Sequence, residues 1–305
     1  MTNATWNDFW LNEGFTVYFE HRISEKLYGK DYSDMTAVLG HQDLLGTLKD
    51  VAEGTHPEDS KLKLDLAGRD PDDGMTDIAY EKGYALLRLL ESKVGRERFD
   101  AFLRGYFDRF AFQSMTTEGF VAYLKEQLLD PNKVALDLDR WIYQAGLPED
   151  DIVPGSAKFT QVEGEIARWQ KGTPAKQLAT AGWTTFEWIH FVRHLPDGLD
   201  RSRMSELDSA FGFTGSGNSE ILTAWLEQCI KNDHAPAYEK LDAFLTTVGR
   251  RKFLTPLYEA LIKTEKGRAM AQNIYKAARP NYHAVAVRTI DELLDWKEMA
   301  GPISL

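Results

Sequence analysis

Apolar residues recur at helical spacing from the start of the chain. One row in residues 5–28 consists of Trp6, Phe9, Trp10, Val17, Ile23 and Leu27, and a second row consists of Leu11, Phe15, Tyr18 and Phe19. A helix that is apolar on two faces is usually buried. The pattern therefore predicts a buried helix, with Thr5 and Asp8 spaced as a capping box at its start. Two carboxylates, Glu13 and Glu20, fall inside the first row.

The same periodicity predicts helices along most of the remaining chain. A helix over residues 77–95 has Asp77 as its N-cap and Gly95 as its stop, and another covers residues 116–129. Short helices are expected around residues 164–172, 174–180, 184–194, 202–210, 218–231, 236–247, 256–264, 266–278 and 282–297. No convincing strand is present, so we predict an all-α fold in which antiparallel helix pairs stack.

Two stretches interrupt the helical pattern. Residues 55–77 are polar and rich in Pro, Gly and Asp, which indicates a long loop, and long ordered loops are often functional. Residues 144–161 carry two prolines, two glycines and a run of acidic residues, which indicates a linker. The predicted organisation is a first domain over residues 1–148, a linker over 149–163 and a second domain over 164–305.

The net charge, the lengths of the apolar runs and the cysteine count exclude several kinds of partner and site. The chain has 305 residues and a formal net charge of −11, which argues against a nucleic-acid backbone or an anionic membrane as the main partner. No run approaches 18 consecutive apolar residues, so no membrane span is expected. The single cysteine, Cys229, excludes an internal disulfide and a zinc ribbon, and it is expected to be a buried structural thiol.

Two motifs carry little chemical signal. Residues 212–217, GFTGSG, lack both a preceding strand and the Lys-Ser/Thr ending of a phosphate loop, so a plain turn is expected. His190 and His194 have the four-residue spacing of a zinc clamp, with Glu187 as a conceivable third ligand. No Glu follows the first histidine, and the segment is a good amphipathic helix, so a structural role is favoured.

Glu13 raises a sharper question. A buried carboxylate is costly unless it is paired, protonated or bound to a metal. The residues alone leave open a salt-bridged core glutamate and a metal ligand, and they favour the salt bridge.

Two motifs, however, resemble a known family. WLNEGF over residues 10–15 and DIAYEKGYALL over residues 77–87 resemble the M1 zinc aminopeptidases (gluzincins), most closely the leukotriene A4 hydrolase branch. The resemblance implies that Glu13 is the third zinc ligand, nineteen positions after a His-Glu-x-x-His motif. It also implies that Tyr80 stabilises the tetrahedral intermediate, although a helix-packing tyrosine is the alternative. Glu20 is expected either to hydrogen-bond a ligand histidine or to form an ordinary salt bridge.

Other segments extend the resemblance to nearly the whole chain. THP at residues 55–57, DPDD at 70–73 and WIYQAGLP at 141–148 are similar to the branch, and Asp72 matches the acidic residue of its specificity pocket. GRRKF at residues 249–253 resembles its carboxylate-recognising segment, which implies that Arg250 and Lys252 bind substrate. A solvated basic run is the alternative. Thr255 and Pro256 predict a helix start just behind these two cations.

Two departures limit the resemblance. The sequence contains no His-Glu-x-x-His motif, so two zinc ligands and the general base are missing. Met75 stands where the branch has a tyrosine, which weakens the case for epoxide hydrolysis and leaves peptide hydrolysis as the expected activity.

The resemblance implies the helical second half of a thermolysin-like catalytic domain followed by an armadillo-like helical superhelix. The expected function is that of a fragment of a zinc metallo-aminopeptidase that removes N-terminal residues from short peptides. The chain alone is expected to be inactive and not to retain zinc. The alternative is a non-enzymatic helical scaffold that binds peptides or protein partners. If a separate chain supplies the missing N-terminal half, exposed apolar surface on residues 6–27 is expected to mark its docking site. The compartment stays open.

Overall fold

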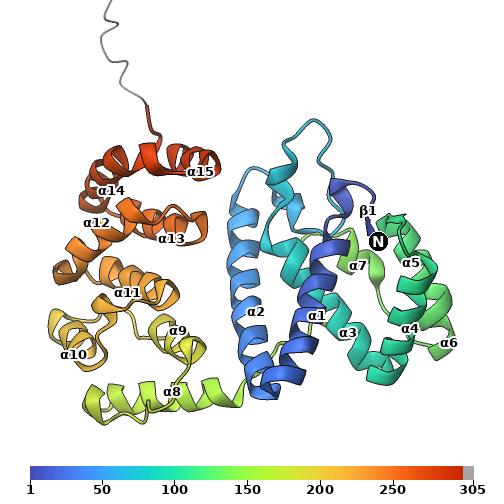
Figure 1. Ribbon diagram of the computed structural model, residues 1–305, viewed down its shortest axis with the longest axis horizontal. Coiled ribbons are helices and arrows are strands. Elements are labelled where there is room, and N and C mark those ends of the chain that lie inside the picture. The colour runs from blue at the N-terminus through green and yellow to red at the C-terminus, as the bar shows by residue number, and fades with distance from the viewer. Residues whose placement is uncertain (298–305) are drawn as a thin grey trace, which may run out of the picture. The chain divides into compact units, whose positions relative to one another are not determined.

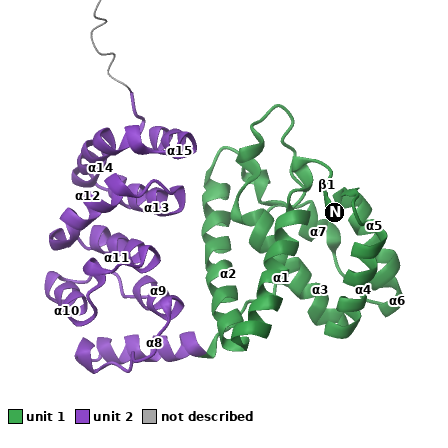
Figure 2. Cartoon of the chain, viewed as in Figure 1, with its two compact units in different colours: residues 1–157 green, residues 158–305 purple. Residues whose placement is uncertain are grey.

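The computed structural model describes residues 1–297 and is helical nearly throughout, which confirms the predicted all-α class (Figure 1). The chain divides into two compact units, residues 1–157 and 158–305 (Figure 2). Each unit has its own apolar core. The first resembles the helical half of a thermolysin-like catalytic domain, and the second is a stack of short helices of armadillo-like type.

Helices of two to seven turns build most of the first unit. Its α-helices are α1 Trp10–Tyr28, α2 Lys30–Glu53, α3 Gly83–Val94, α4 Arg96–Arg109, α5 Thr117–Leu124, α6 Asp130–Asn132 and α7 Leu138–Ile142. Its shorter turns are η1 Trp6–Asp8, η2 Pro57–Ser60, η3 Pro71–Gly74, η4 Ile78–Lys82 and η5 Lys125–Leu129. Among residues 1–297, the only strands are β1 Thr2–Asn3 and β2 Ser114–Met115, which pair in parallel with Thr2 opposite Ser114.

Glycines with positive φ separate consecutive helices in this unit. Gly29 (φ 91°) lies between α1 and α2, and Gly95 (φ 84°) lies between α3 and α4. Only glycine adopts this backbone region without strain, so both turns are short. The helix predicted over residues 77–95 ends at Gly95 as expected, whereas α2 and α4 were not predicted.

The start of the first helix differs from the predicted capping box. The chain makes a 3₁₀ turn over η1 and becomes α-helical only at Trp10. The hydroxyl of Thr5 does not cap the turn but donates to the carboxylate of Asp8 at 2.7 Å.

Asp8 is the centre of a buried polar network that fixes this start. The residue is 0% exposed, and one carboxylate oxygen accepts from the backbone N–H and the hydroxyl of Thr117, both at 2.8 Å. The same oxygen lies 2.6 Å from Nζ of Lys63, and the indole of Trp10 donates to the Thr117 hydroxyl at 3.0 Å. The network therefore ties α1 to the long loop and to α5, segments far apart in sequence.

Two glycines allow α1 and the segment leading into α3 to touch backbone to backbone. A Cβ on Gly14 would lie 2.8 Å from Cα of Gly83, and a Cβ on Gly83 would lie 2.9 Å from Cα of Gly14. Real Cβ atoms do not approach so closely, so neither position accepts a larger residue without moving a helix. Gly14 follows Glu13 and Gly83 comes three residues after Tyr80, so this contact places the two candidate site segments side by side.

The second unit is a stack of short helices, drawn from yellow-green to red in Figure 1. Its elements are α8 Ala157–Gln170, η6 Ala175–Gln177, α9 Thr185–Arg193, α10 Arg201–Phe211, η7 Phe213–Gly215, α11 Ser219–Lys231, η8 Ala235–Ala237, α12 Tyr238–Thr247, α13 Arg251–Ile262, α14 Glu265–Ala278, η9 Arg279–Asn281 and α15 Ala284–Leu294. Most coincide with the predicted short helices. Cys229 is a buried thiol in its core, as expected.

The predicted linker over residues 149–163 is wrong in its second half. α8 begins at Ala157, and only the residues before it are irregular. The helix was missed because residues 154–157 read as a break, although Phe159, Val162, Ile166 and Trp169 form a buried stripe directly behind them. Over residues 1–297, no helix combines the length and the apolar character that crossing a bilayer requires.

Candidate functional site

Glu13 lies in the first turn of α1 with a partly exposed side chain. Within residues 1–297, its carboxylate has neither a hydrogen-bond donor nor a cation as a partner. Burial raises the pKa of the Glu13 carboxyl above its ordinary value. The core salt bridge that the sequence favoured is therefore not formed. The helix face that contains Glu13 is also less buried than predicted, because Glu20 and Ile23 on it are exposed.

Tyr80 lies beside Glu13. It belongs to η4, a π-helical turn, and its ring packs edge-on against Phe9 with centroids 5.9 Å apart. Burial raises the pKa of the Tyr80 phenol, and the negative charge of Glu13 and then of Asp77 raises it further. The phenol therefore stays protonated and remains a hydrogen-bond donor at neutral pH. π-helical turns occur frequently at functional sites.

Glu81, next to Tyr80, is a half-buried acid that the sequence did not reveal. Its carboxylate packs against Gly40 of α2, where a side chain on that glycine would collide with it. Burial raises the pKa of Glu81 to about 8, with further contributions from the carboxylates of Asp77, Asp43 and Glu20. Glu81 is therefore largely protonated at neutral pH.

The pKa of Glu81 predicts a pH-dependent stability. The unfolded carboxyl titrates near 4.5, so between pH 4.5 and 8 the folded chain holds a proton that the unfolded chain has lost. Stability contributed by this group falls as pH rises through that window. Glu81→Gln should therefore change stability by less than about 1 kcal/mol at pH 5 and increase it at pH 8 by on the order of 3–4 kcal/mol. Urea unfolding at both pH values measures this, with exposed Glu97→Gln as the control; an equal effect at both pH values would contradict it.

Asp72 lies on the ordered loop predicted over residues 55–77. It is exposed in η3, and the Asp70 carboxylate caps this turn by accepting from the Asp72 backbone N–H at 3.0 Å. Arg69 fastens the loop with a two-pronged contact to Asp59, at 3.1 and 2.6 Å. The structure thus presents the Asp72 carboxylate on a rigid turn, without a partner among residues 1–297.

Arg250 and Lys252 lie in the second unit, at the start of α13. Arg250 is the N-cap residue and is exposed, and no carboxylate among the described residues pairs with it. Lys252, also exposed, lies 2.7 Å from a carboxylate oxygen of Glu220. The helix start predicted at Thr255 and Pro256 is wrong, because α13 begins at Arg251 and Pro256 lies inside it. The N-terminus of α13 therefore lies directly at the two cations, where its dipole favours an anion.

The two histidines of the possible zinc clamp both have polar partners within the second unit. His190 is buried, stacks on Phe159 at 3.9 Å and lies 3.0 Å from a carboxylate oxygen of Glu163 through Nε2. Glu187 does not join it but caps α9 by accepting from the Thr184 backbone N–H at 2.7 Å. GFTGSG forms a turn around Gly212, as expected.

The described residues do not by themselves form a complete metal site. No group of three or more His, Cys, Asp or Glu side chains in residues 1–297 is arranged to hold a metal ion. The structure brings Glu13 and Tyr80 together, and it places Asp72 on a separate turn of the same unit. Glu13 fits a single metal ligand that needs further ligands from elsewhere, because a half-buried carboxylate without a counter-charge is costly.

Lys82 is a second residue whose place the sequence did not indicate. It follows Glu81, is fully buried and donates through Nζ to the carbonyls of Ser60 and Gln144, at 2.8 and 3.1 Å. Burial lowers the pKa of its amine to about 7, with a smaller contribution from Arg140. Lys82 therefore anchors the segment that carries Tyr80 to the loop and to the end of the unit. The only sequence feature that could have indicated this role is the position of a charged residue in an apolar helical row.

Comparison with family models gives two successive matches. Residues 1–141 match the peptidase family M1 domain, and residues 183–294 match the model described as leukotriene A4 hydrolase, C-terminal. The first match contains Glu13, Asp72 and Tyr80, and the second contains Arg250 and Lys252.

Curated relatives agree with these matches. Aminopeptidase B of Rattus norvegicus is 31% identical over 312 residues, which covers 96% of this chain and 48% of the relative. Leucine aminopeptidase 2 of Ajellomyces capsulatus is 29% identical, covering 93% of this chain and 47% of the relative. The chain thus spans about half the length of the relatives that it matches.

Solved structures give the same result. A yeast LTA4 hydrolase in complex with bestatin superposes with a TM-score of 0.85 at 27% identity, covering 97% of this chain and 51% of that structure. A native leukotriene A4 hydrolase from Saccharomyces cerevisiae gives a TM-score of 0.73 at 26% identity, with the same coverage. The family models, the relatives and the superposed structures together show that the chain belongs to peptidase family M1.

Proposed function

We propose that the protein to which this chain belongs is a zinc-dependent aminopeptidase that removes N-terminal residues from short peptides. The observation that carries the proposal is the partnerless, half-buried carboxylate of Glu13 beside the protonated phenol of Tyr80. A metal ion would supply the missing counter-charge for Glu13. The relatives named aminopeptidase support the peptidase class.

In this proposal each residue has a distinct role. Glu13 would hold zinc together with two histidines from outside this chain, and a metal held there would supply Lewis-acid chemistry for the scissile carbonyl and the attacking water. Tyr80 donates a hydrogen bond to the oxygen on which negative charge develops. Asp72 attracts the N-terminal amine of the substrate. Arg250 and Lys252, with the N-terminus of α13, attract its C-terminal carboxylate.

The chain by itself is proposed to be inactive. Its sequence contains no His-Glu-x-x-His, so the general base and two zinc ligands must come from a further M1 segment. We propose that this segment packs on η1 and α1, since Trp6 of η1 and Ile23 and Leu27 of α1 are 48%, 57% and 66% exposed. Exposed apolar side chains that lie together are typical of an interaction surface.

The proposal is tested by comparing two proteins. One is the 305-residue chain, and the other is the same chain extended upstream to the length of its relatives. The extended protein should bind one zinc per chain, measured by metal analysis, and should hydrolyse aminoacyl p-nitroanilides. An extended protein that folds but neither binds zinc nor cleaves these substrates would favour a helical scaffold that binds peptides or protein partners.

Tyr80→Phe tests the second catalytic residue. In the extended, zinc-loaded protein this change removes only the phenol donor, so we expect kcat to fall about 10²–10³-fold, as for the loss of one oxyanion donor elsewhere. KM and zinc content should change little, because the donor acts on charge that develops in the transition state. Tyr28→Phe, on the exposed end of α1, is the control. An undiminished kcat in Tyr80→Phe would show that Tyr80 only packs against Phe9.

A further inference from the structure

A cavity in the first unit lies outside the candidate active site. It has a volume of 360 Å³ and lies among α1, α2, α3 and the start of α4. Its lining is rich in charged and polar side chains, among them His21, Arg22, Glu25, Arg88, Glu91 and Arg96. Neither Glu13 nor Tyr80 belongs to it.

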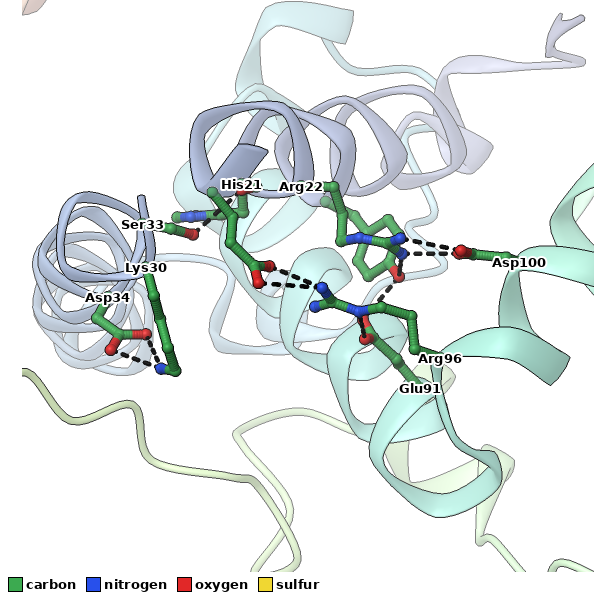
Figure 3. Close-up of polar contacts among 10 residues, drawn as sticks. His21, Arg22, Lys30, Ser33, Asp34, Glu91, Arg96 and Asp100 are labelled. Carbon is green, nitrogen blue, oxygen red and sulfur yellow. Dashed lines mark hydrogen bonds and ion pairs between the residues drawn. The ribbon is translucent and has the colours of Figure 1, made fainter. Parts of the chain in front are cut away.

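Most charges in the cavity wall neutralise one another. Lys30 lies 2.6 Å from Asp34, and Arg96 lies 2.6 Å from Glu91 and 2.9 Å from Glu25. Arg22 makes a two-pronged contact with Asp100, with nitrogen–oxygen distances of 2.8 and 3.0 Å. Figure 3 shows these pairs, each drawn from two elements or two turns of one helix. Paired groups of this kind have little charge left for a ligand.

Arg88 is the exception. It lies on α3, and its guanidinium donates to the backbone carbonyl of Ile152 at 2.7 Å through Nη1. Among residues 1–297, no carboxylate lies within ion-pair distance of it. Its remaining N–H groups therefore have no carboxylate partner among these residues, and Arg88 lines the cavity. A planar guanidinium suits the paired oxygens of a carboxylate or a phosphate group.

His21 supplies a complementary acceptor. It is 8% exposed and stacks on Tyr84 with ring centroids 4.3 Å apart. Its Nδ1 lies 3.2 Å from the hydroxyl of Thr36, and that hydroxyl has its single proton directed at a backbone carbonyl, with Ser33 O nearest at 3.0 Å. With the hydroxyl proton on that carbonyl, the Thr36 oxygen accepts from Nδ1–H, and in this tautomer the lone pair lies on Nε2.

The neutral form of His21 is the relevant one. Burial lowers the pKa of the ring to about 4, with a partial offset from the Ser33 backbone and a further lowering by Arg88. Nε2 has no partner among the described residues, and it is not sealed from solvent, unlike Nδ1 of His190 or His234. The cavity wall therefore combines one free cation with one free acceptor nitrogen.

We infer that this cavity binds a phosphate group that keeps one acidic proton. Two unprotonated oxygens face Arg88, and the P–OH group donates to Nε2 of His21. Glu25, Asp34 and Glu91 lie in the same wall, and Glu25 shares Arg96 with Glu91, so these carboxylates disfavour a fully deprotonated dianion more than a monoanion bound to Arg88. The cavity volume admits either inorganic phosphate or a small phosphate monoester.

The test compares three anions on the 305-residue chain by isothermal titration at about pH 6 and constant ionic strength. Inorganic phosphate and phenyl phosphate keep a proton in large part at this pH, whereas sulfate keeps none. Saturable binding of a phosphate compound is expected, at least about tenfold tighter than sulfate, because sulfate leaves Nε2 without a donor. Tighter phenyl phosphate binding would identify a monoester as the ligand, and tighter inorganic phosphate binding would identify the free ion.

Two variants assign the contacts. Arg88→Gln should weaken phosphate binding at least about tenfold. His21→Phe keeps the stacking on Tyr84 and should bring the phosphate and sulfate affinities close together. Arg98→Gln is the matched control, because Arg98 also donates to a backbone carbonyl but does not line the cavity. The inference would be overturned if the unmodified chain did not bind phosphate, if it bound phosphate and sulfate equally, or if Arg88→Gln did not weaken phosphate binding. Circular dichroism checks that the variants are folded.

Discussion

Glu13→Gln should abolish zinc binding by the upstream-extended protein and, with it, peptidase activity. Glutamine matches the shape of glutamate but lacks the negative charge that a metal ligand supplies. We expect zinc affinity to fall more than about 100-fold, beyond the 10–100-fold typical of residues that only orient a ligand. Metal analysis after dialysis and the aminoacyl p-nitroanilide assay measure both losses. Glu97→Gln, at an exposed position on α4, should bind zinc and cleave normally.

In the 305-residue chain alone, the same variant should not lower the folding stability. Without a partner, the Glu13 carboxylate bears only the cost of burial, which raises its pKa. Glu13→Gln should therefore leave the free energy of unfolding unchanged or increase it. Breaking a buried salt bridge would instead cost about 3–5 kcal/mol. A strongly destabilised Glu13→Gln chain, or an extended variant that keeps its zinc, would contradict the role proposed for Glu13.

Asp8→Ala should be the most destabilising single change in the first unit. Four donors converge on this fully buried carboxylate, from Thr5, Lys63 and, twice, Thr117. Removing the carboxylate leaves the buried end of the network unsatisfied, so we expect a loss of about 3–5 kcal/mol. Urea unfolding followed by tryptophan fluorescence measures it, and exposed Asp50→Ala should change stability by less than about 0.5 kcal/mol.

The pH dependence gives an independent check on Asp8. Burial by itself raises the pKa of this carboxyl, but hydrogen bonds from Lys63, Thr5 and Thr117 outweigh it and lower the pKa below 3.8. The stabilisation is therefore complete above the unfolded value and is lost as pH falls through the folded one. The stability difference between the parent chain and Asp8→Ala should shrink toward pH 2. A difference that is constant with pH would contradict the proposed ion pair.

Sequence periodicity correctly predicted the helices whose buried residues recur at regular spacing along one face. The short helices of the second unit were expected nearly where they occur, since residues such as Leu222, Trp225 and Leu226 recur on one face. α2 was missed because few of its residues, Met35, Ala37 and Leu44, are buried. The pairing of β1 with β2 joins residues more than a hundred positions apart, and no local pattern reports such a contact.

Sequence analysis predicted only those candidate site residues that belong to a family motif. Glu13, Tyr80, Asp72, Arg250 and Lys252 came from resemblance, and their roles stay predictions. The raised pKa of Glu81 results mainly from burial and then from the nearby carboxylates of Asp77, Asp43 and Glu20, and the burial exists only in the folded unit. The sequence likewise does not indicate that Arg88 lacks a carboxylate partner, because the ion pairs of the neighbouring cations form only in the folded unit.

The contact between Gly14 and Gly83 has a consequence for how this protein can vary. Side-chain contacts shift when a neighbour changes size, but here the distance between two segments is set by main-chain atoms that every variant shares. Glu13 and Tyr80 are attached to these segments, so at this point their separation does not depend on the size of a core side chain. Substitutions of core residues that leave both glycines and the anchoring contacts of Asp8 and Lys82 in place should therefore preserve the interval between the two groups.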